Sequence, residues 1–275
     1  EIVREQLARN NIKLVRGRAS FEDEHTILVR SDDGTQHLTT QHVLVAVGTT
    51  PAEPDDVEID GQTFVTSDQI LGLPDLPRSL AVIGAGVIGI EYACMFAALG
   101  VRVTVIDRRA RPLGFLDAEI VDELMSQMRR ELVTFRCSEQ IASVESVTTP
   151  LPSALIKLES GKRVVAEAVL YSVGRRGATD SLGLARIDLE ADARGLLQVD
   201  DQLRTGVENV YAAGDVIGFP ALAATSSEQG RLAACHMFGV NADPMAAHYP
   251  VGIYAIPEIS MVGATEEELT EQGIP

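Results

Sequence analysis

The alternation of apolar and polar residues predicts mostly short strands in the first part of the chain. Three β-rich runs occupy residues 13–21, 25–40 and 42–48, and the second contains an Asp-Gly turn at Asp33 and Gly34. Residues 1–11 differ, because their pattern is that of part of a helix. Residues 74–79 hold two prolines and indicate a linker.

The pattern changes after this linker. A buried strand at residues 80–83 runs into a glycine turn, which is followed by a helical pattern over residues 87–99 that Gly100 closes. Another strand follows directly at residues 101–106. The order strand, helix, strand predicts one βαβ unit.

Further elements follow this unit. Asp117 is expected to cap a helix whose apolar residues lie on one face: Ile120, Val121, Leu124, Met125, Met128 and Leu132. Residues 154–174 predict a hairpin and then a buried strand, and residues 208–215 predict a strand that ends in a Gly-Asp turn. Thr265 and Glu268 have the spacing of a helix capping box.

Composition and charge exclude several classes of protein. The chain has 275 residues, 45% of them hydrophobic, and a net charge of -17, which disfavours nucleic acids and anionic membranes as partners. No apolar run approaches the roughly 20 residues that span a bilayer. The five histidines show no metal-binding spacing, so no metal site is expected. Cys94, Cys137 and Cys235 are too dispersed for a disulfide framework, which favours a reducing, cytoplasmic location.

The glycine turn carries the clearest chemical signal. Gly84, Gly86 and Gly89 form a GxGxxG motif between a predicted strand and a predicted helix. The first glycine permits the sharp turn, the second lets the backbone approach a pyrophosphate, and the third lets helix and strand pack closely. Asp107 ends the next strand, 23 residues after Gly84, where the ribose of a dinucleotide would lie. The arrangement favours dinucleotide binding over a purely structural turn.

Six stretches, in this order, resemble the two-dinucleotide flavoprotein disulfide reductase family, and most closely its Si-specific branch that catalyses transhydrogenation. They are VLVAVGTTP, GAGVIGIEYA, SVGRRGATDSL, VYAAGDVIGFPALAA, EQGRLAA and IPEISMVGATEEEL. The resemblance covers essentially the whole chain. The ordered set of motifs is much more specific than any one of them.

The resemblance implies an α/β flavoprotein with two dinucleotide-binding domains, in which a Rossmann-like NAD(P) domain is inserted in an FAD domain. The implied domains are an FAD segment at 1–72, the NAD(P) domain at 73–193, a second FAD segment at 194–247 and the start of an interface domain at 248–275. The chain is then expected to be truncated at both ends and inactive alone. An FAD pyrophosphate loop and any CxxxxC disulfide are expected before Glu1, and the complete protein is expected to form a homo-oligomer.

The resemblance also implies roles for individual residues. The NAD(P) site would comprise Gly84, Ala85, Gly86, Val87, Ile88, Gly89, Asp107, Arg108, Arg109, Gly174 and Arg175. The FAD site would comprise Arg18, Ala19, Gly48, Thr49, Gly214, Asp215, Leu222, Ala223 and Ala224. Glu91 resembles an acid that supports the flavin through a lysine, although a solvated helix carboxylate is the alternative. No catalytic residue is expected in this chain.

The implied reaction moves a hydride from NADPH to FAD and on to NAD+, with FAD, NAD and NADP as cofactors. Two alternatives stay open: an FAD-dependent disulfide reductase of dihydrolipoamide dehydrogenase type, and a non-catalytic NAD(P)-binding redox module. A protein that uses both nucleotides suits the turn after residue 106, because Asp107 could accept a ribose hydroxyl while Arg108 and Arg109 attract a 2′-phosphate. The alternative interpretation is that these arginines only belong to a solvated loop.

Overall fold

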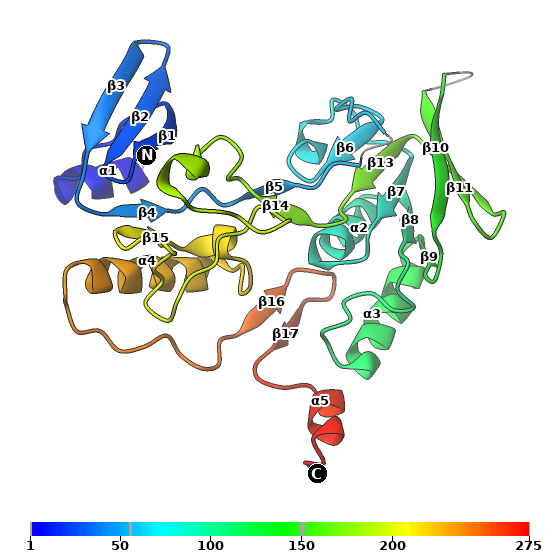
Figure 1. Ribbon diagram of the computed structural model, residues 1–275. Coiled ribbons are helices and arrows are strands. Elements are labelled where there is room, and N and C mark those ends of the chain that lie inside the picture. Colours follow the sequence, from blue (N-terminus) through cyan, green and yellow to red (C-terminus); the bar gives the residue numbers. More distant parts are fainter. Residues whose placement is uncertain (1, 55–56, 149–151, 275) are drawn as a thin grey trace. The chain divides into compact units, whose positions relative to one another are not determined.

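The computed structural model describes residues 2–54, 57–148 and 152–274, and the chain forms two compact units (Figure 1). Unit 1 consists of Glu1–Thr50 and Arg176–Met245, and unit 2 consists of Pro51–Arg175 and Ala246–Pro275. The short strands β5 (Thr49–Pro51) and β14 (Arg175–Gly177) pair where the chain passes from one unit to the other.

Unit 2 is built on a five-stranded sheet whose strand pairs are all parallel. In spatial order its strands are β6 (Phe64–Thr66), β13 (Ala168–Tyr171), β7 (Ser79–Ile83), β8 (Arg102–Ile106) and β9 (Val133–Arg136). Helix α2 (Val87–Ala98) connects β7 to β8, and α3 (Ala118–Arg130) precedes β9. The predicted βαβ unit is confirmed, with Gly100 following the helix at a φ of 85°.

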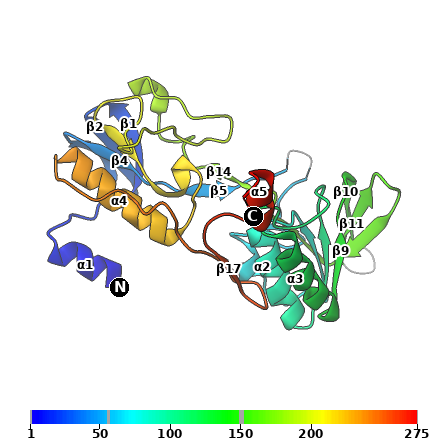
Figure 2. The same cartoon turned by 90° about the horizontal axis from the view of Figure 1, so that it is seen from below.

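Both faces of this sheet are covered, which is why its strands are almost continuously apolar. Helices α2 and α3 lie side by side along one face (Figure 2), and their apolar residues share one core with β7, β8 and β13. The opposite face packs against the antiparallel strands β10 (Ile141–Val147), β11 (Ser153–Leu158) and β12 (Arg163–Ala166). The predicted hairpin and the buried strand after it are therefore confirmed.

Helix α3 corrects part of the predicted apolar face. Val121, Leu124, Met125 and Met128 are buried, but Ile120 is 49% exposed. Ile120 lies roughly a quarter turn away from the centre of the buried stripe, so it falls at its solvent edge. Leu132 is also exposed, because the helix ends at Arg130 and Leu132 adopts a positive φ of 64°.

The last segment of unit 2 joins the same core. Strands β16 (Val251–Ile253) and β17 (Ile259–Met261) pair antiparallel, and Ile253 packs into the cluster that α2 and α3 share. The predicted capping box is confirmed at the start of α5 (Glu266–Glu271). Asp117 precedes α3 as expected, but it does not cap that helix through its side chain, because the carboxylate accepts a hydrogen bond from the backbone of Glu266.

Unit 1 combines a small antiparallel sheet with a parallel strand pair. Strands β1 (Arg18–Asp23), β2 (Thr26–Ser31) and β3 (Gly34–Thr39) form the sheet. The turn between β2 and β3 lies at Asp32 and Asp33, one residue earlier than predicted, because Gly34 already pairs with Ser31 as the first residue of β3. Strand β4 (Val43–Val45) pairs parallel with β15 (Val210–Ala212). The described part of this unit also contains the helices α1 (Ile2–Arg9) and α4 (Ala223–Met237) and the 3-10 turns η2 (Leu184–Ile187) and η3 (Gly214–Ile217).

The compact units change at Thr50/Pro51, Arg175/Arg176 and Met245/Ala246. The domains implied by the sequence change instead at residues 72/73, 193/194 and 247/248. The two divisions describe different things, because one follows packing and the other follows cofactors. The cofactor domains therefore stay a prediction. No helix in the described ranges is long and apolar enough to cross a membrane.

Leu170 allows a test of the unit 2 core. It is fully buried in β13, whereas Val165 in the neighbouring β12 is 62% exposed. We expect Leu170→Ala to lower the free energy of unfolding by about 2–5 kcal/mol, because it leaves a cavity between sheet and helices. The matched variant Val165→Ala should cost less than about 0.5 kcal/mol. Urea titration followed by circular dichroism measures both, and equal losses would contradict the packing described.

Candidate functional site

The carboxyl ends of β7, β8 and β13 meet at one edge of the parallel sheet of unit 2. The ladder aligns Ile83 with Ile106 on one side and with Tyr171 on the other. The chain runs from β7 outward to β8 and β9, and then returns to the opposite side of β7 as β13. Such a reversal of strand order opens the crevice where α/β sheets bind their ligands.

The glycine turn at this edge is fixed by close backbone packing. Gly84 has a φ of 101°, and a Cβ there would lie 2.5 Å from the carbonyl oxygen of Ser172. A Cβ on Gly89 would overlap the carbonyl oxygen of Gly84. Neither position can hold a side chain, as the motif predicts for the first and third glycines.

Gly86 is different, because no atom of the described residues lies within 4 Å of the place where its Cβ would be. Its φ of -79° is open to other residues, so the fold itself does not require glycine here. Gly86 is also the N-cap of α2 and supplies no side-chain cap to the helix. The first N–H groups of a helix lack partners within the helix, so this end of α2 fits the pyrophosphate of a dinucleotide.

The other residues of the turn have distinct positions. Ala85 is fully buried, and its carbonyl oxygen accepts a hydrogen bond from the N–H of Leu113 at 3.1 Å. Val87 and Ile88 are half-buried in the first turn of α2. They shape the turn through their backbone and contribute no polar side chain.

Ser172 is a residue of this edge that the sequence analysis missed. Its hydroxyl lies 2.9 Å from the carbonyl oxygen of Ile83 and 3.0 Å from that of Gly84, and it donates to this pair. It thereby ties the end of β13 to the glycine turn. The signal in the sequence was a single serine at the end of a buried strand, but only the parallel pairing of β13 with β7 gives it a partner.

Asp107 sits at the centre of the edge, with its side chain only 7% exposed. Its Oδ2 accepts hydrogen bonds from the N–H of Ala85 at 2.6 Å and from Nη2 of Arg109 at 2.7 Å. Its Oδ1 accepts from the backbone N–H of Arg109 at 2.7 Å and from Nε of Arg109 at 3.0 Å. The carboxylate therefore joins the glycine turn to the loop that follows β8.

Burial by itself would raise the pKa of Asp107. The hydrogen bonds from the guanidinium of Arg109 and from the N–H of Ala85 outweigh burial, and hold the pKa below its ordinary value. The same contact with Asp107 raises the pKa of Arg109. The pair is therefore an ion pair at neutral pH.

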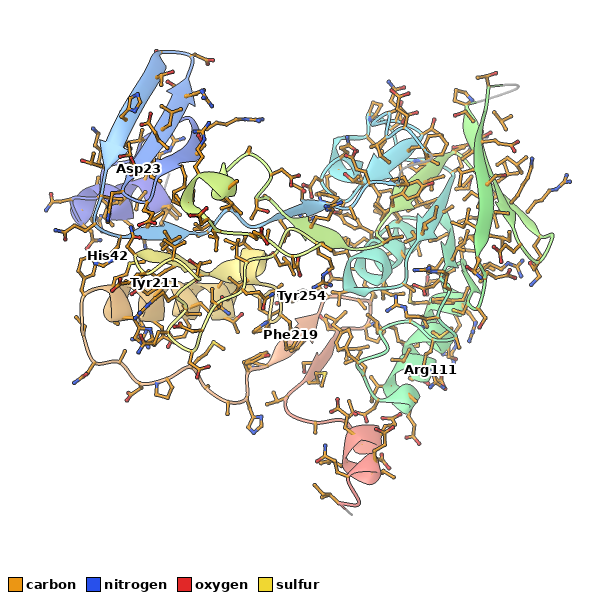
Figure 3. The ribbon with its side chains drawn as sticks, in the orientation of Figure 1. Asp23, His42, Arg111, Tyr211, Phe219 and Tyr254 are labelled. Atoms are coloured by element: carbon orange, nitrogen blue, oxygen red, sulfur yellow. The ribbon has the colours of Figure 1, made fainter. Side chains whose placement is uncertain are left out.

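The three arginines of this loop differ in their surroundings. Arg109 forms the ion pair with Asp107, and its side chain remains 53% exposed. Arg111, labelled in Figure 3, pairs with Asp122 of α3 through two hydrogen bonds of 3.0 and 3.1 Å. Arg108 is exposed. The loop is thus partly ordered by its own charges, and only Arg109 reaches the glycine turn through Asp107.

Gly174 and Arg175 follow β13 at the same edge. Gly174 has a φ of 129°, and its carbonyl oxygen accepts a hydrogen bond from the N–H of Ala52 at 3.0 Å. Arg175 donates through Nη1 to Asp68 at 3.1 Å and to Ser67 at 3.2 Å. Both residues follow shortly after Ser172, whose hydroxyl contacts the glycine turn.

Glu91 has a protein partner in unit 2. Its Oε1 accepts a hydrogen bond from the backbone N–H of Tyr254 at 2.8 Å. This contact joins α2 to the loop after β16. The structure thus gives Glu91 a structural role in the described part of the chain, and its flavin-side role stays a proposal.

Unit 1 brings together another set of the predicted residues. Gly48 and Gly214 follow the parallel strands β4 and β15, at positive φ values of 68° and 80°. Asp215 lies next to Gly214 in the turn η3. Because parallel strands end at the same edge, this is a second strand edge of the kind that receives a ligand. Thr49 begins β5 directly after Gly48.

Helix α4 begins beside this edge. Leu222 is its N-cap and makes no side-chain cap, and Ala223 and Ala224 are its first two residues, so their N–H groups have no partner within the helix. A Cβ on Gly214 would lie 3.4 Å from Oγ of Ser226 in the same helix. The uncapped N-terminus fits a group that gains negative charge, as the flavin edge would on reduction.

Gln229 is a second residue that the sequence analysis missed. It is 4% exposed, and its Oε1 accepts a hydrogen bond from the N–H of Gly214 at 2.8 Å. Its position within EQGRLAA was visible in the sequence, but the partner 15 residues earlier was not. Arg18 and Ala19 are both exposed at the start of β1, an outer strand of the antiparallel sheet.

Comparison with known sequences gives a consistent result. Residues 2–230 match the family described as pyridine nucleotide-disulphide oxidoreductase. The chain is 50% identical over 278 positions to the soluble pyridine nucleotide transhydrogenase of Mycobacterium tuberculosis strain H37Ra. It is 46% identical over 269 positions to the protein of the same name from Chromohalobacter salexigens. These alignments cover 100% and 98% of this chain, but 58% and 57% of the relatives.

Solved structures give the same fold. LpdA from Mycobacterium tuberculosis superposes with a TM-score of 0.91 at 28% identity, over 98% of this chain and 60% of that one. The HOCl-induced flavoprotein disulfide reductase RclA from Escherichia coli has a TM-score of 0.88 at 26% identity, over 99% of this chain and 63% of its own. The α/β fold expected from the sequence is confirmed, and the chain spans about 60% of these proteins.

The pKa of Asp107 predicts how stability depends on pH. Because the folded-state pKa is lowered, the carboxylate contributes stability above its ordinary value of 3.8, and this contribution is lost as the pH falls through the folded-state pKa. We expect Asp107→Asn to lower the free energy of unfolding at pH 7 by about 1–3 kcal/mol, and to flatten its loss below about pH 4.

Asp122→Asn is the matched control, because its ion pair with Arg111 is exposed and should contribute less than about 1 kcal/mol. Urea titrations between about pH 7 and pH 2.5 measure both variants. An unchanged acid profile in Asp107→Asn would contradict the ionised, hydrogen-bonded carboxylate.

Proposed function

We propose that this chain, which belongs to the pyridine nucleotide-disulphide oxidoreductase family, is the nucleotide-binding part of an FAD-dependent pyridine nucleotide transhydrogenase. The observation that carries the proposal is the identity of 50% with a soluble pyridine nucleotide transhydrogenase, which extends over all of this chain. The aligned region covers both sheet edges. The proposed reaction is hydride transfer from NADPH to FAD, and from FAD to NAD+.

Sequence identity favours this activity over disulfide reduction. Curated relatives with the transhydrogenase name share 42% to 50% of their aligned residues with this chain. The flavoprotein disulfide reductase RclA shares 26%. The same fold supports both reactions, so the fold alone does not distinguish them.

Bound FAD would supply the chemistry, since a flavin accepts a hydride from one nicotinamide ring and returns it to another. Gly48, Gly214, Asp215 and the start of α4 would hold this cofactor in unit 1. Asp215 suits a flavin-chain hydroxyl, because a carboxylate accepts hydrogen bonds. Arg18, Ala19 and Thr49 would contact it more peripherally.

The nicotinamide nucleotides would bind in unit 2. The open side of Gly86 and the uncapped N-terminus of α2 would hold the pyrophosphate, while Gly84 and Gly89 keep strand, turn and helix in contact. Gly174 and Arg175 would border the nucleotide at the same strand edge. The chain's work is then binding and orientation, and the reaction requires no protein acid or base.

Three finer properties complete the proposal. Hydride transfer is proposed to be Si-specific, and the complete protein is proposed to be a homo-oligomer. We also propose a cytoplasmic location, which the free thiols of Cys94, Cys137 and Cys235 support, because reduced cysteines suit a reducing compartment.

Steady-state kinetics test the reaction. If one flavin serves both nucleotides in turn, the complete protein should oxidise NADPH and reduce a NAD+ analogue with parallel double-reciprocal plots, the pattern of a ping-pong mechanism. Intersecting plots, or NADPH oxidation that proceeds only with a disulfide acceptor, would contradict the proposal.

Gly86 tests the nucleotide site separately. Gly86→Ala should leave the melting temperature nearly unchanged, because nothing lies within 4 Å of the new methyl group. It should weaken NADP+ and NAD+ binding at least about tenfold, because the methyl group would obstruct the approach of the pyrophosphate to the backbone. Gly72→Ala, another open and exposed position of unit 2, is the control. Normal affinity in Gly86→Ala, measured by calorimetry, would contradict pyrophosphate binding at this turn.

A further inference from the structure

The hydrogen bonds of Asp107 leave its carboxylate no free acceptor position. A carboxylate offers about four lone-pair positions, two on each oxygen. Oδ2 accepts from Ala85 N–H and Arg109 Nη2, and Oδ1 accepts from Arg109 N–H and Arg109 Nε, at distances between 2.6 and 3.0 Å. A ribose hydroxyl could donate to this carboxylate only by displacing one of these bonds.

Arg109 is in the opposite situation. Its guanidinium group carries five N–H donors, of which Nε–H and one N–H of Nη2 are used on Asp107. Among the residues that the structure describes, the remaining N–H groups have no acceptor, and 53% of the side chain is exposed. The free hydrogen-bonding capacity of this ion pair therefore lies on the arginine.

We propose that Arg109 recognises the 2′ position of the adenine ribose, and that Asp107 is the positioning residue that holds its guanidinium group in place. The inference rests on the proposed nucleotide site and deepens it. The same N–H groups can donate to the 2′-hydroxyl oxygen of NAD and to the 2′-phosphate of NADP. One fixed guanidinium group thus accommodates both nucleotides, with the stronger contact to the phosphate.

The loop around the pair is held by backbone hydrogen bonds. Asp107 donates to the carbonyl oxygen of Arg136 and accepts from Glu139, each at 3.1 Å, while the carbonyl oxygen of Arg109 accepts from Ser138 at 3.0 Å. A planar guanidinium group held by two parallel bonds loses little further freedom on binding. Preorganisation of this kind favours affinity, because less side-chain ordering remains to be done.

Charge supports the same assignment. An isolated carboxylate would repel a 2′-phosphate, but the charge of Asp107 is compensated by Arg109 at 2.7 Å. Arg108, exposed in the same loop, adds a further positive charge. In a protein whose net charge is -17, this local excess of cations is what a phosphate needs.

This assignment reverses one expectation from the sequence. If Asp107 accepted the ribose hydroxyl, its replacement would mainly weaken NAD binding. If Asp107 acts through Arg109, its replacement mainly weakens NADP binding. The two roles therefore predict opposite changes in the ratio of affinities.

The test measures the affinities of NADP+, NAD+ and adenosine 2′,5′-bisphosphate by calorimetry on the complete protein. The variants are Asp107→Asn, Arg109→Gln, their double variant and Arg111→Gln, which removes the same charge from the same loop. We expect each single change at the pair to weaken NADP+ and the bisphosphate about 10- to 100-fold, and NAD+ less than about threefold. The double variant should lose no more than Arg109→Gln alone, and Arg111→Gln should change little.

Several outcomes would overturn the inference. These are a selective loss of NAD+ binding in Asp107→Asn, equal losses for both nucleotides, or losses that add in the double variant. If Asp107→Asn does not fold, Arg109→Gln and Arg109→Lys decide, because lysine keeps the charge but cannot form the paired contact. Full recovery of NADP+ affinity in Arg109→Lys would then refute the positioning role.

These measurements are independent of the reaction. Oxidised nucleotides and the bisphosphate bind without hydride transfer, so a protein that shows the expected affinities but transfers no hydride would refute only the proposed function. A protein that transfers hydride but shows unchanged affinities in Arg109→Gln would refute only this inference.

Discussion

The backbone of the glycine turn lies so close to its neighbours that positions 84 and 89 have no room for a side chain. Gly84 packs against the carbonyl of Ser172, and Gly89 packs against the carbonyl of Gly84 itself. This packing fixes where α2 begins relative to β7 and β13. It also places the N–H of Ala85 within 2.6 Å of Asp107, so the loop after β8 is tied to the same point. The strand edge of unit 2, at which we propose that the nucleotides bind, therefore depends on this steric constraint.

Charge adds a second level of order to this edge. In a strongly acidic protein, a local group of cations favours phosphate binding. An isolated carboxylate at Asp107 would oppose this, but Asp107 accepts hydrogen bonds that orient Arg109, and the arginine compensates its negative charge. Asp107 and Arg109 have opposite effects on a phosphate when considered separately, but in the fold they form one ion pair. Asp107 orients the guanidinium group, and Arg109 has further N–H groups that can donate to a ligand.

Much of the fold could be predicted because its signals are local. The apolar patterns of β7, α2 and β8, and the glycines that follow β7 and α2, can be recognised without knowledge of distant contacts. The errors lie where tertiary packing decides. Ile120 and Leu132 continue an apolar pattern, but the sheet covers only one face of α3 and the helix ends at Arg130. Asp117 looks like a cap, and its partner proves to be Glu266, far along the chain.

The sequence by itself determined the βαβ unit, the positions of the required glycines and the presence of an acid followed by arginines. These follow from local sterics and periodicity, which neighbouring residues fix among themselves. Only the tertiary structure decided how the polar groups pair. It placed Ser172 and Gln229 beside their backbone partners. It also placed N–H groups of Ala85 and Arg109 where they donate to the two carboxylate oxygens of Asp107. The physical reason is that a hydrogen bond depends on distance in space, and strand pairing sets that distance independently of separation along the chain.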